Sequence, residues 1–124
     1  MRIFLKVEIP VEAGNALVKK GKLGEIIQSI LKEQKPEAAY FTEMNGNRTG
    51  LIFLNLTDAS QIPAIAEPWF LALNARIEFH PVMTSDDLAK AGQGIERAAK
   101  KYGGNKGTQY LIRNKYNAPG FQRN

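Results

Sequence analysis

Residues 75–83, Ala-Arg-Ile-Glu-Phe-His-Pro-Val-Met, alternate between apolar and polar side chains. Successive side chains of a β-strand point to opposite faces, so Ile77 and Phe79 are expected to face the core. Pro81 has no backbone N–H to donate, which predicts an edge position or an early end of pairing for this strand. The opposite face of the strand carries three titratable residues, Arg76, Glu78 and His80.

Three further strands are predicted upstream of this one. Residues 2–9 show the same alternation and end at Pro10. Residues 38–43 and 49–56 flank an Asn-Gly-Asn sequence at 45–47, whose residues tolerate positive φ and close hairpins. The sequence therefore predicts one N-terminal strand, a central hairpin and a final strand.

Apolar spacing predicts the helices that connect these strands. A stripe at i, i+3, i+4, i+7 and i+8 over residues 23–31 is typical of an amphipathic helix, and Lys35-Pro36 ends it. A second stripe runs over 62–73, where Pro68 is expected to kink the helix or split it in two. A last helix is predicted from a capping pair at Thr84 and Asp87 to about Tyr102.

The order of these elements is βαββαβ with an added C-terminal helix. Right-handed crossovers turn that order into an α+β fold, a ferredoxin-like four-stranded antiparallel sheet with helices on one face. The other face would expose Phe4, Phe53 and either Tyr40 or Phe41, an apolar area that a single chain is expected to hide. Two sheets packed face to face would hide it, which predicts a homodimer.

Composition sets bounds on the class of protein. The 124 residues are 44% hydrophobic and 23% charged, which fits one globular domain, expected over residues 1–102. The absence of cysteine excludes disulfides, thiolate catalysis and cysteine metal sites. No run approaches the roughly 20 apolar residues of a membrane span, so we expect no membrane partner and a cytoplasmic location.

The net charge of +5 is unevenly distributed. Residues 1–102 hold 13 basic and 12 acidic residues, whereas 103–124 hold four basic residues and no acidic one. The basicity therefore belongs to a C-terminal tail. Four spread charges make a weak footprint for nucleic acid, so a solubilising extension is favoured, with weak nucleic-acid contact through the tail as the other possibility.

The candidate acid-base site is the pair Glu78 and His80, two residues apart on one strand face. His80 is the only histidine of the chain, and a neighbouring carboxylate can fix its tautomer and raise its pKa. Arg76 is a candidate to bind a substrate carboxylate or enolate. The competing interpretation, favoured here, is that these residues form structural cross-strand charge pairs. One histidine is a thin basis for a metal or haem, so neither a metal nor another cofactor is expected.

A ligand-binding site is predicted in the space bounded by the sheet. The residues expected to line it are Phe4, Lys6, Glu8, Tyr40, Phe53 and Trp69. Trp69 belongs here because a helix kinked at Pro68 opens a gap that aromatic rings can border. A tryptophan on a helical stripe is more often part of the core, and that interpretation is favoured for Trp69.

Three stretches of the chain, residues 35–41, 64–73 and 80–84, carry a resemblance. With them the chain resembles the dimeric α+β barrel superfamily of ferredoxin-like proteins, and within it a family of small bacterial proteins of unknown function, over about residues 1–102. The resemblance implies dimerisation and a cavity between sheet and helices or within the barrel. The superfamily includes cofactor-free monooxygenases, isomerases, haem-dependent enzymes and ligand-sensing domains, so no single reaction is implied.

Together these observations predict a homodimeric module that binds a small organic molecule. The alternative is a cofactor-free isomerase or monooxygenase that uses His80, Glu78 and Arg76. The two hypotheses differ in geometry: the binding module needs aromatic residues around one pocket, and the enzyme needs the three polar side chains to converge on one point.

Overall fold

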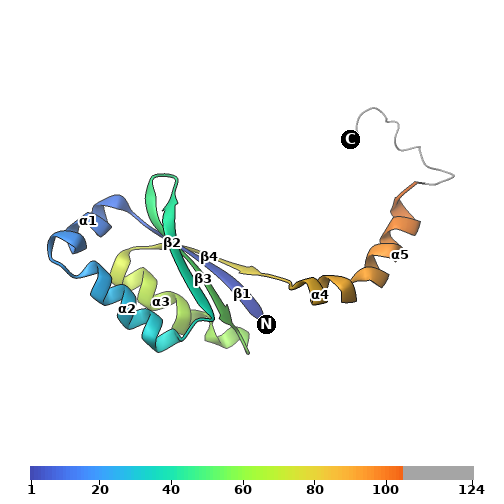
Figure 1. Cartoon of the computed structure of the whole chain (residues 1–124), viewed down its shortest axis with the longest axis horizontal. Coiled ribbons are helices and arrows are strands. Elements are labelled where there is room, and N and C mark those ends of the chain that lie inside the picture. Colours follow the sequence, from blue (N-terminus) through green and yellow to red (C-terminus); the bar gives the residue numbers. More distant parts are fainter. Residues whose placement is uncertain (105–124) are drawn as a thin grey trace. The chain divides into compact units, whose positions relative to one another are not determined.

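The computed structural model describes residues 1–104, and the chain divides into two units, Met1–Val82 and Met83–Asn124. The first unit contains a four-stranded sheet and its helices (Figure 1). Its elements are β1 (Arg2–Ile9), α1 (Val11–Lys19), α2 (Leu23–Gln34), β2 (Ala38–Met44), β3 (Asn47–Asn55), a 3₁₀ turn η1 (Ala59–Gln61), α3 (Ile62–Leu73) and β4 (Arg76–Pro81).

The strands lie in the order β2-β3-β1-β4, and every neighbouring pair is antiparallel. This α+β architecture is compatible with the ferredoxin-like arrangement expected from the element order. The strand with Pro81 lies at an edge of the sheet, as its missing N–H predicted. In the register, Phe4 of β1 lies between Phe53 of β3 and His80 of β4, so the two central strands and one edge share a cross-strand row.

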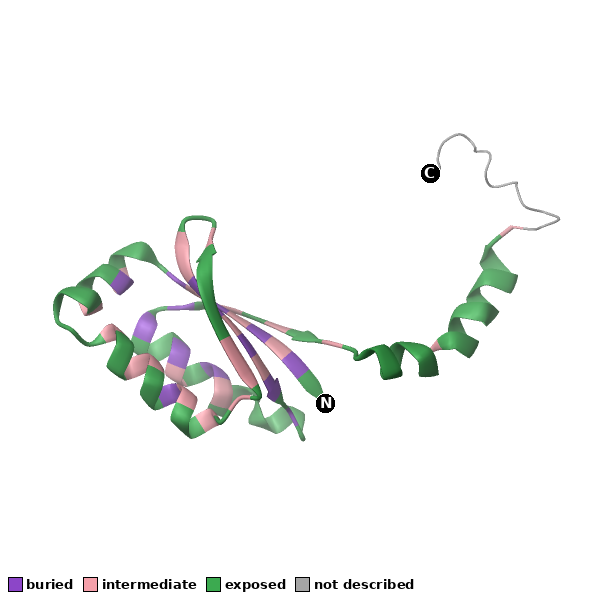
Figure 2. Cartoon of the chain, in the orientation of Figure 1, coloured by how far each residue is buried: buried purple, intermediate pink, exposed green. Residues whose placement is uncertain are grey.

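One face of the sheet is covered by helices and forms the core. Along β1 the residues Ile3, Leu5, Val7 and Ile9 are all buried, and α1, α2 and α3 lie on their side of the sheet (Figures 1 and 2). Leu5 and Ile52, which are cross-strand partners, are 0% exposed. The stripe of α3 supplies Trp69 and Leu73 to the same cluster. Burial of these side chains is the main stabilising contribution to this unit.

Residues with positive φ end the elements. Lys35 adopts φ 49° at the end of α2, and Asn74 adopts φ 52° at the end of α3. Asn45 and Gly46 have φ of 56° and 79° and form the β2–β3 turn. Two successive residues with positive φ match the right-handed twist of a hairpin, which is why an Asn-Gly pair occurs here. Asn47 therefore belongs to β3 rather than to the turn predicted at 45–47.

Two predictions about helices differ from the structure in detail. Of the two outcomes expected at Pro68, the split is wrong, because α3 is a single helix with Pro68 inside it, and the kink stays a prediction. The helix predicted from residue 84 to residue 102 is two helices, α4 (Ser85–Lys90) and α5 (Gly92–Tyr102), separated at Ala91. Gly92 and Gly94 follow this point, and glycine weakens a helix because it loses the most backbone freedom on folding.

The second unit begins with a capping box. Thr84 Oγ1 accepts a hydrogen bond from the backbone N–H of Asp87 at 3.1 Å, and the Asp87 carboxylate accepts one from the Thr84 N–H at 3.1 Å. This reciprocal pair satisfies two backbone donors at the helix start, as the sequence predicted. Nearly the whole tail predicted over 103–124, and with it the suggested nucleic-acid contact, lies outside the described residues.

Candidate functional site

Three aromatic rings lie in one cross-strand row on the sheet face opposite the helices. Phe4 stacks on Phe53 with ring centroids 5.2 Å apart and 20° between the planes. On its other side in the row, Phe4 stacks on His80. The centroids of these two rings are 5.9 Å apart, and the angle between their planes is 26°. Stacked rings of this spacing contribute about 0.5–1.5 kcal/mol per pair beyond their buried area. We call this side of the sheet the open face.

Charged side chains occupy the neighbouring rows of the open face. Lys6 Nζ lies 3.9 Å from Glu8 Oε1 and 3.8 Å from Glu78 Oε2, so its ammonium group forms ion pairs with both carboxylates. The Glu8 carboxylate also accepts a hydrogen bond from Asn47 Nδ2 at 2.6 Å, and only 13% of its side chain is exposed. The open face therefore joins an aromatic row to a compact network of both charge signs.

Glu78 and His80 contact each other, as their spacing on one strand predicted. His80 Nε2 lies 2.9 Å from Glu78 Oε1, and about half of each side chain is exposed. The hydrogen bond with His80, followed by the positive charge of Lys6, lowers the pKa of the Glu78 carboxyl below its usual 4.5. A group with a lowered folded-state pKa stabilises the fold above pH 4.5, and that contribution is lost as the pH falls through its folded value.

We expect this shift to be visible in a carboxyl ¹³C NMR titration. The midpoint of Glu78 lies below 4.5 in the wild-type chain and moves up in a His80→Leu variant, which has no hydrogen-bond donor at this position. Arg2→Gln is the control, because Arg2 pairs with Glu37 at 2.7 Å and lowers the pKa of that carboxyl instead. A Glu78 midpoint that is the same with and without His80 would contradict the assigned cause.

Arg76, the third candidate catalytic residue, lies in a different row from His80. Its register partner is Glu8, and the two side chains line a cavity of about 220 Å³ together with Asn47. That volume is smaller than the 300–1,000 Å³ usual for ligand sites. The structure thus brings His80 and Glu78 into direct contact, while Arg76 is placed beside Glu8.

The predicted ligand-lining residues separate into two groups. Phe4, Phe53 and Tyr40 belong to the open face, where Tyr40 of the edge strand β2 pairs with Leu51 and is 61% exposed. Trp69 is on the covered side, 1% exposed within the core, and its Nε1–H donates to Gln34 Oε1 at 3.3 Å. The structure therefore does not bring Trp69 together with the other aromatic residues, in line with the favoured core interpretation.

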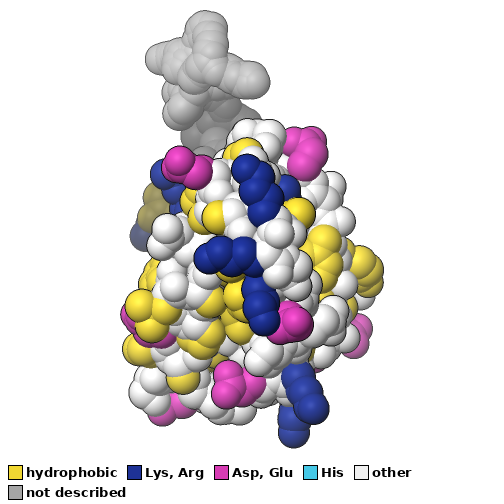
Figure 3. Space-filling view, turned by 90° about the vertical axis from the view of Figure 1, so that its left-hand side faces the viewer, with side chains coloured by type: hydrophobic (Ala, Val, Ile, Leu, Met, Phe, Trp, Pro, Cys, Tyr) yellow, Lys and Arg dark blue, Asp and Glu magenta, His cyan; other side chains and the backbone are white. Residues whose placement is uncertain are grey.

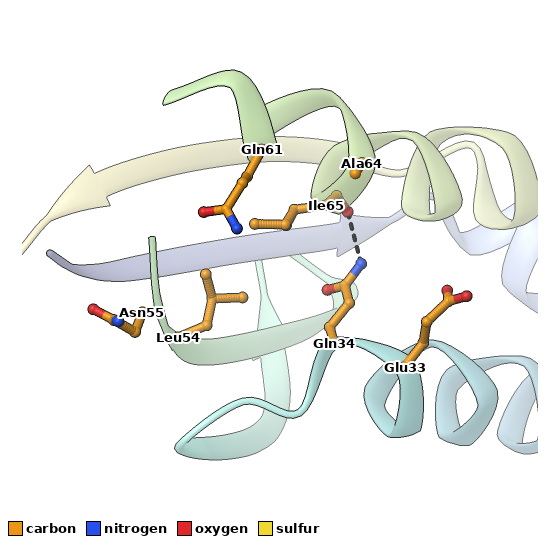
Figure 4. Close-up of a pocket in the computed structure, with 7 residues that line it drawn as sticks. All are labelled: Glu33, Gln34, Leu54, Asn55, Gln61, Ala64 and Ile65. Atoms are coloured by element: carbon orange, nitrogen blue, oxygen red, sulfur yellow. Dashed lines mark hydrogen bonds between the residues drawn. The ribbon is translucent and has the colours of Figure 1, made fainter. Parts of the chain in front are cut away.

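A larger cavity, of about 440 Å³, opens between α2, α3 and the end of β3 (Figure 4). Its lining residues are Glu33, Gln34, Leu54, Asn55, Gln61, Ala64 and Ile65. The Gln34 Nε2–H donates to the carbonyl of Ile65 across the cavity, at 2.9 Å. Gln61 Oε1 accepts from the backbone of Thr57, which fixes the carboxamide of Gln61 at the cavity rim. This cavity has no sequence signature, because its polar residues are dispersed and share no spacing.

Basic side chains gather where α1 and α2 meet. Figure 3 faces this side of the sheet unit and shows lysine and arginine side chains among hydrophobic ones. The end of α1 and the connection to α2 carry exposed Lys19, Lys20 and Lys22, of which Lys22 lies 3.6 Å from Glu25. Residues 1–82 hold nine basic and nine acidic residues, so this cluster is local and the unit as a whole has no net charge for attracting a polyanion.

Neither metal-ligating clusters nor membrane spans occur in residues 1–104. Within that range no three His, Asp or Glu side chains are grouped so that they could hold a metal ion. No helix of the described part is long and apolar enough to cross a membrane.

Comparison with known proteins gave no relatives. No protein-family model, curated protein or solved structure matches the chain. The candidate site is therefore interpreted from its own geometry.

Proposed function

We propose that this protein binds a small organic molecule as a homodimer, in which two ferredoxin-like units pack their open faces together as a dimeric α+β barrel. The observation that supports this proposal most directly is the stacked row of Phe53, Phe4 and His80 on a sheet face that no helix of the same unit covers. Large apolar patches on a soluble chain mark interaction sites.

The charges of the open face favour a second copy as the partner. Lys6 lies between Glu8 and Glu78, so the face carries both signs within a short distance. A two-fold axis brings the same patch of each subunit against the other, and a patch with both signs can be complementary to itself. A patch of one sign would repel its own copy.

The ligand is expected beside the aromatic row. A flat ring can pack across the exposed edges of Phe4 and Phe53, while a hydroxyl or carbonyl group on that ring can bond to His80 in the same row or to Glu78 or Lys6 in the adjoining row. The substrate class that fits is a small aromatic compound with one or two polar substituents. The charged network fixes its orientation, because polar groups buried at an interface require partners.

Light scattering tests the dimer. We expect the wild-type chain to be a dimer at micromolar concentration and Phe53→Arg to weaken association at least about a hundredfold, since an unpaired charge would be buried at the interface. Leu71→Arg is the matched control, because Leu71 lies on α3 and is 80% exposed. A monomeric wild type, or a Phe53→Arg variant that dimerises normally, would refute the packing of open faces.

Thermal shift measurements test the ligand. The probes are catechol and 4-hydroxybenzoate, with cyclohexanecarboxylate as the non-aromatic counterpart. Binding to the folded state raises the Tm, and we expect the aromatic probes to do so in the wild type but not in Phe4→Ala. Ala64→Phe, which fills the cavity between α2 and α3, should leave the shift intact. Loss of the shift in Ala64→Phe alone would place the ligand in that cavity instead.

A second function, cofactor-free acid-base catalysis, is favoured by the 2.9 Å contact between His80 and Glu78. If Nε2 donates to the carboxylate, Nδ1 keeps its lone pair and can accept a proton from a ligand packed beside the aromatic row. A bound carbonyl compound would then exchange its acidic C–H protons with deuterium from solvent. Exchange that stops in His80→Gln supports catalysis, and exchange at the uncatalysed rate in the wild type refutes it.

A further inference from the structure

The C-terminal arm, defined as residues 83–104, presents an apolar stripe that stays exposed among the residues that the structure describes. In α5 the stripe has the helical spacing i, i+3, i+4 and i+7 and consists of Ile95, Ala98, Ala99 and Tyr102. Ile95 is 57% exposed and Tyr102 76% exposed, and Leu88 of α4 is 52% exposed. No residue of the arm is buried (Figure 2).

The two helices of the arm are too short to be stable without a partner. The helix α4 has six residues and α5 has 11, whereas isolated helices below about 12–15 residues are marginal in water. The capping box at Thr84 adds about 1 kcal/mol, which does not replace packing. Stability of the arm therefore requires that its stripe be covered by another surface.

We propose that the arm docks its apolar stripe on a second copy of this chain. The arm follows β4 directly, and β4 is the edge strand beside β1 that contributes His80 to the open face. The arm is therefore joined in the chain to a strand that the proposed function places at the interface with the partner copy. In this respect the inference rests on the proposed dimer.

The composition of the arm favours a protein surface over a lipid one. Residues 83–104 hold four basic and three acidic residues, with Asp86, Asp87 and Glu96 among them. A helix that binds anionic lipids typically has a strongly basic polar face and several large apolar side chains. Here two of the four stripe residues of α5 are alanine, and small side chains suit close approach to another polypeptide surface.

Site-directed photo-cross-linking tests the docking in the full chain, which has no cysteine of its own. A benzophenone maleimide is attached to Ala98→Cys, in the stripe, or to Gln93→Cys, on the opposite side of α5. We expect covalent dimers from the Ala98→Cys protein in several-fold higher yield. Equal yields, or cross-links confined to single chains, overturn the inference.

The Kd of the dimer, measured in variants of the arm and of the open face, tests docking of the arm separately from the proposed dimer. Ile95→Asp should raise the Kd of the dimer about tenfold by removing one buried aliphatic contact, whereas Gln93→Asp in the same helix should not. If Phe53→Arg breaks the dimer while Ile95→Asp and Gln93→Asp leave its Kd unchanged, the arm's docking alone is overturned. A monomeric wild type overturns both, and stripe-dependent sedimentation with phosphatidylglycerol vesicles overturns the second copy as occupant.

Discussion

Replacement of Trp69 by alanine is expected to lower the free energy of unfolding by about 3–5 kcal/mol, the usual cost of deleting a buried aromatic side chain. Trp69 is 1% exposed and packs in the cluster that α3 forms with the covered face of the sheet. A domain of this size has a total stability of about 5–15 kcal/mol, so the variant should lose from about a fifth to all of it. Urea unfolding followed by circular dichroism measures the loss.

A conservative variant separates packing from hydrogen bonding at this position. Trp69→Phe keeps most of the ring but removes the donor to Gln34 Oε1, and Gln34 is partly exposed, so water can replace the bond. We expect Trp69→Phe to lower the free energy of unfolding by about 1–2 kcal/mol. If Trp69→Ala lowers the free energy of unfolding by less than Trp69→Phe does, the indole ring does not contribute to the core by packing. Protein concentration must be equal in all samples, because dimerisation adds to apparent stability.

Replacement of Leu5 by alanine is expected to lower the free energy of unfolding by about 2–5 kcal/mol. Leu5 is 0% exposed and lies on the central strand β1, between Ile52 and Phe79 in the register, where neighbouring strands cannot easily close around a cavity. The matched control is the same substitution at Leu71, which is 80% exposed and should change stability by less than about 0.5 kcal/mol. Urea unfolding of the two variants gives the comparison directly.

Similar losses at positions 5 and 71 would contradict the placement of Leu5 in the core and of Leu71 at the surface. The sharpest internal comparison is with Phe4, the neighbour of Leu5 on the opposite face. Phe4→Ala should act mainly on association and ligand binding, whereas Leu5→Ala should act on folding of the single chain.

Alternation and turn chemistry were sufficient to predict the sheet. Four strands, their antiparallel class and the edge position of the Pro81 strand all follow from period-two patterns and from one missing N–H. The break at Ala91 was missed because the capping residues and the apolar stripe agree with one continuous helix. Only the glycines at 92 and 94 argue against it, and their cost of about 1 kcal/mol each can be outweighed by packing.

The candidate site was predictable only where its residues share a strand. The contact of Glu78 with His80 follows from their spacing of two, and the stacking of Phe4 on Phe53 required the register of β1 and β3. Arg76 shares the strand face, yet two strand residues rise by about 6–7 Å, which places it beside Glu8 instead. The cavity between α2 and α3 depends on tertiary packing and on dispersed amide residues, which carry no sequence signature.

The two faces of the sheet differ in how freely they can evolve. The covered face needs only apolar side chains of suitable volume, and many combinations of such residues satisfy that need. The open face contributes less to folding of the single chain than the core does, so we expect exchange of its aromatic and charged residues to cost less stability. A lineage of such proteins can therefore acquire new ligands or partners quickly while its backbone stays the same.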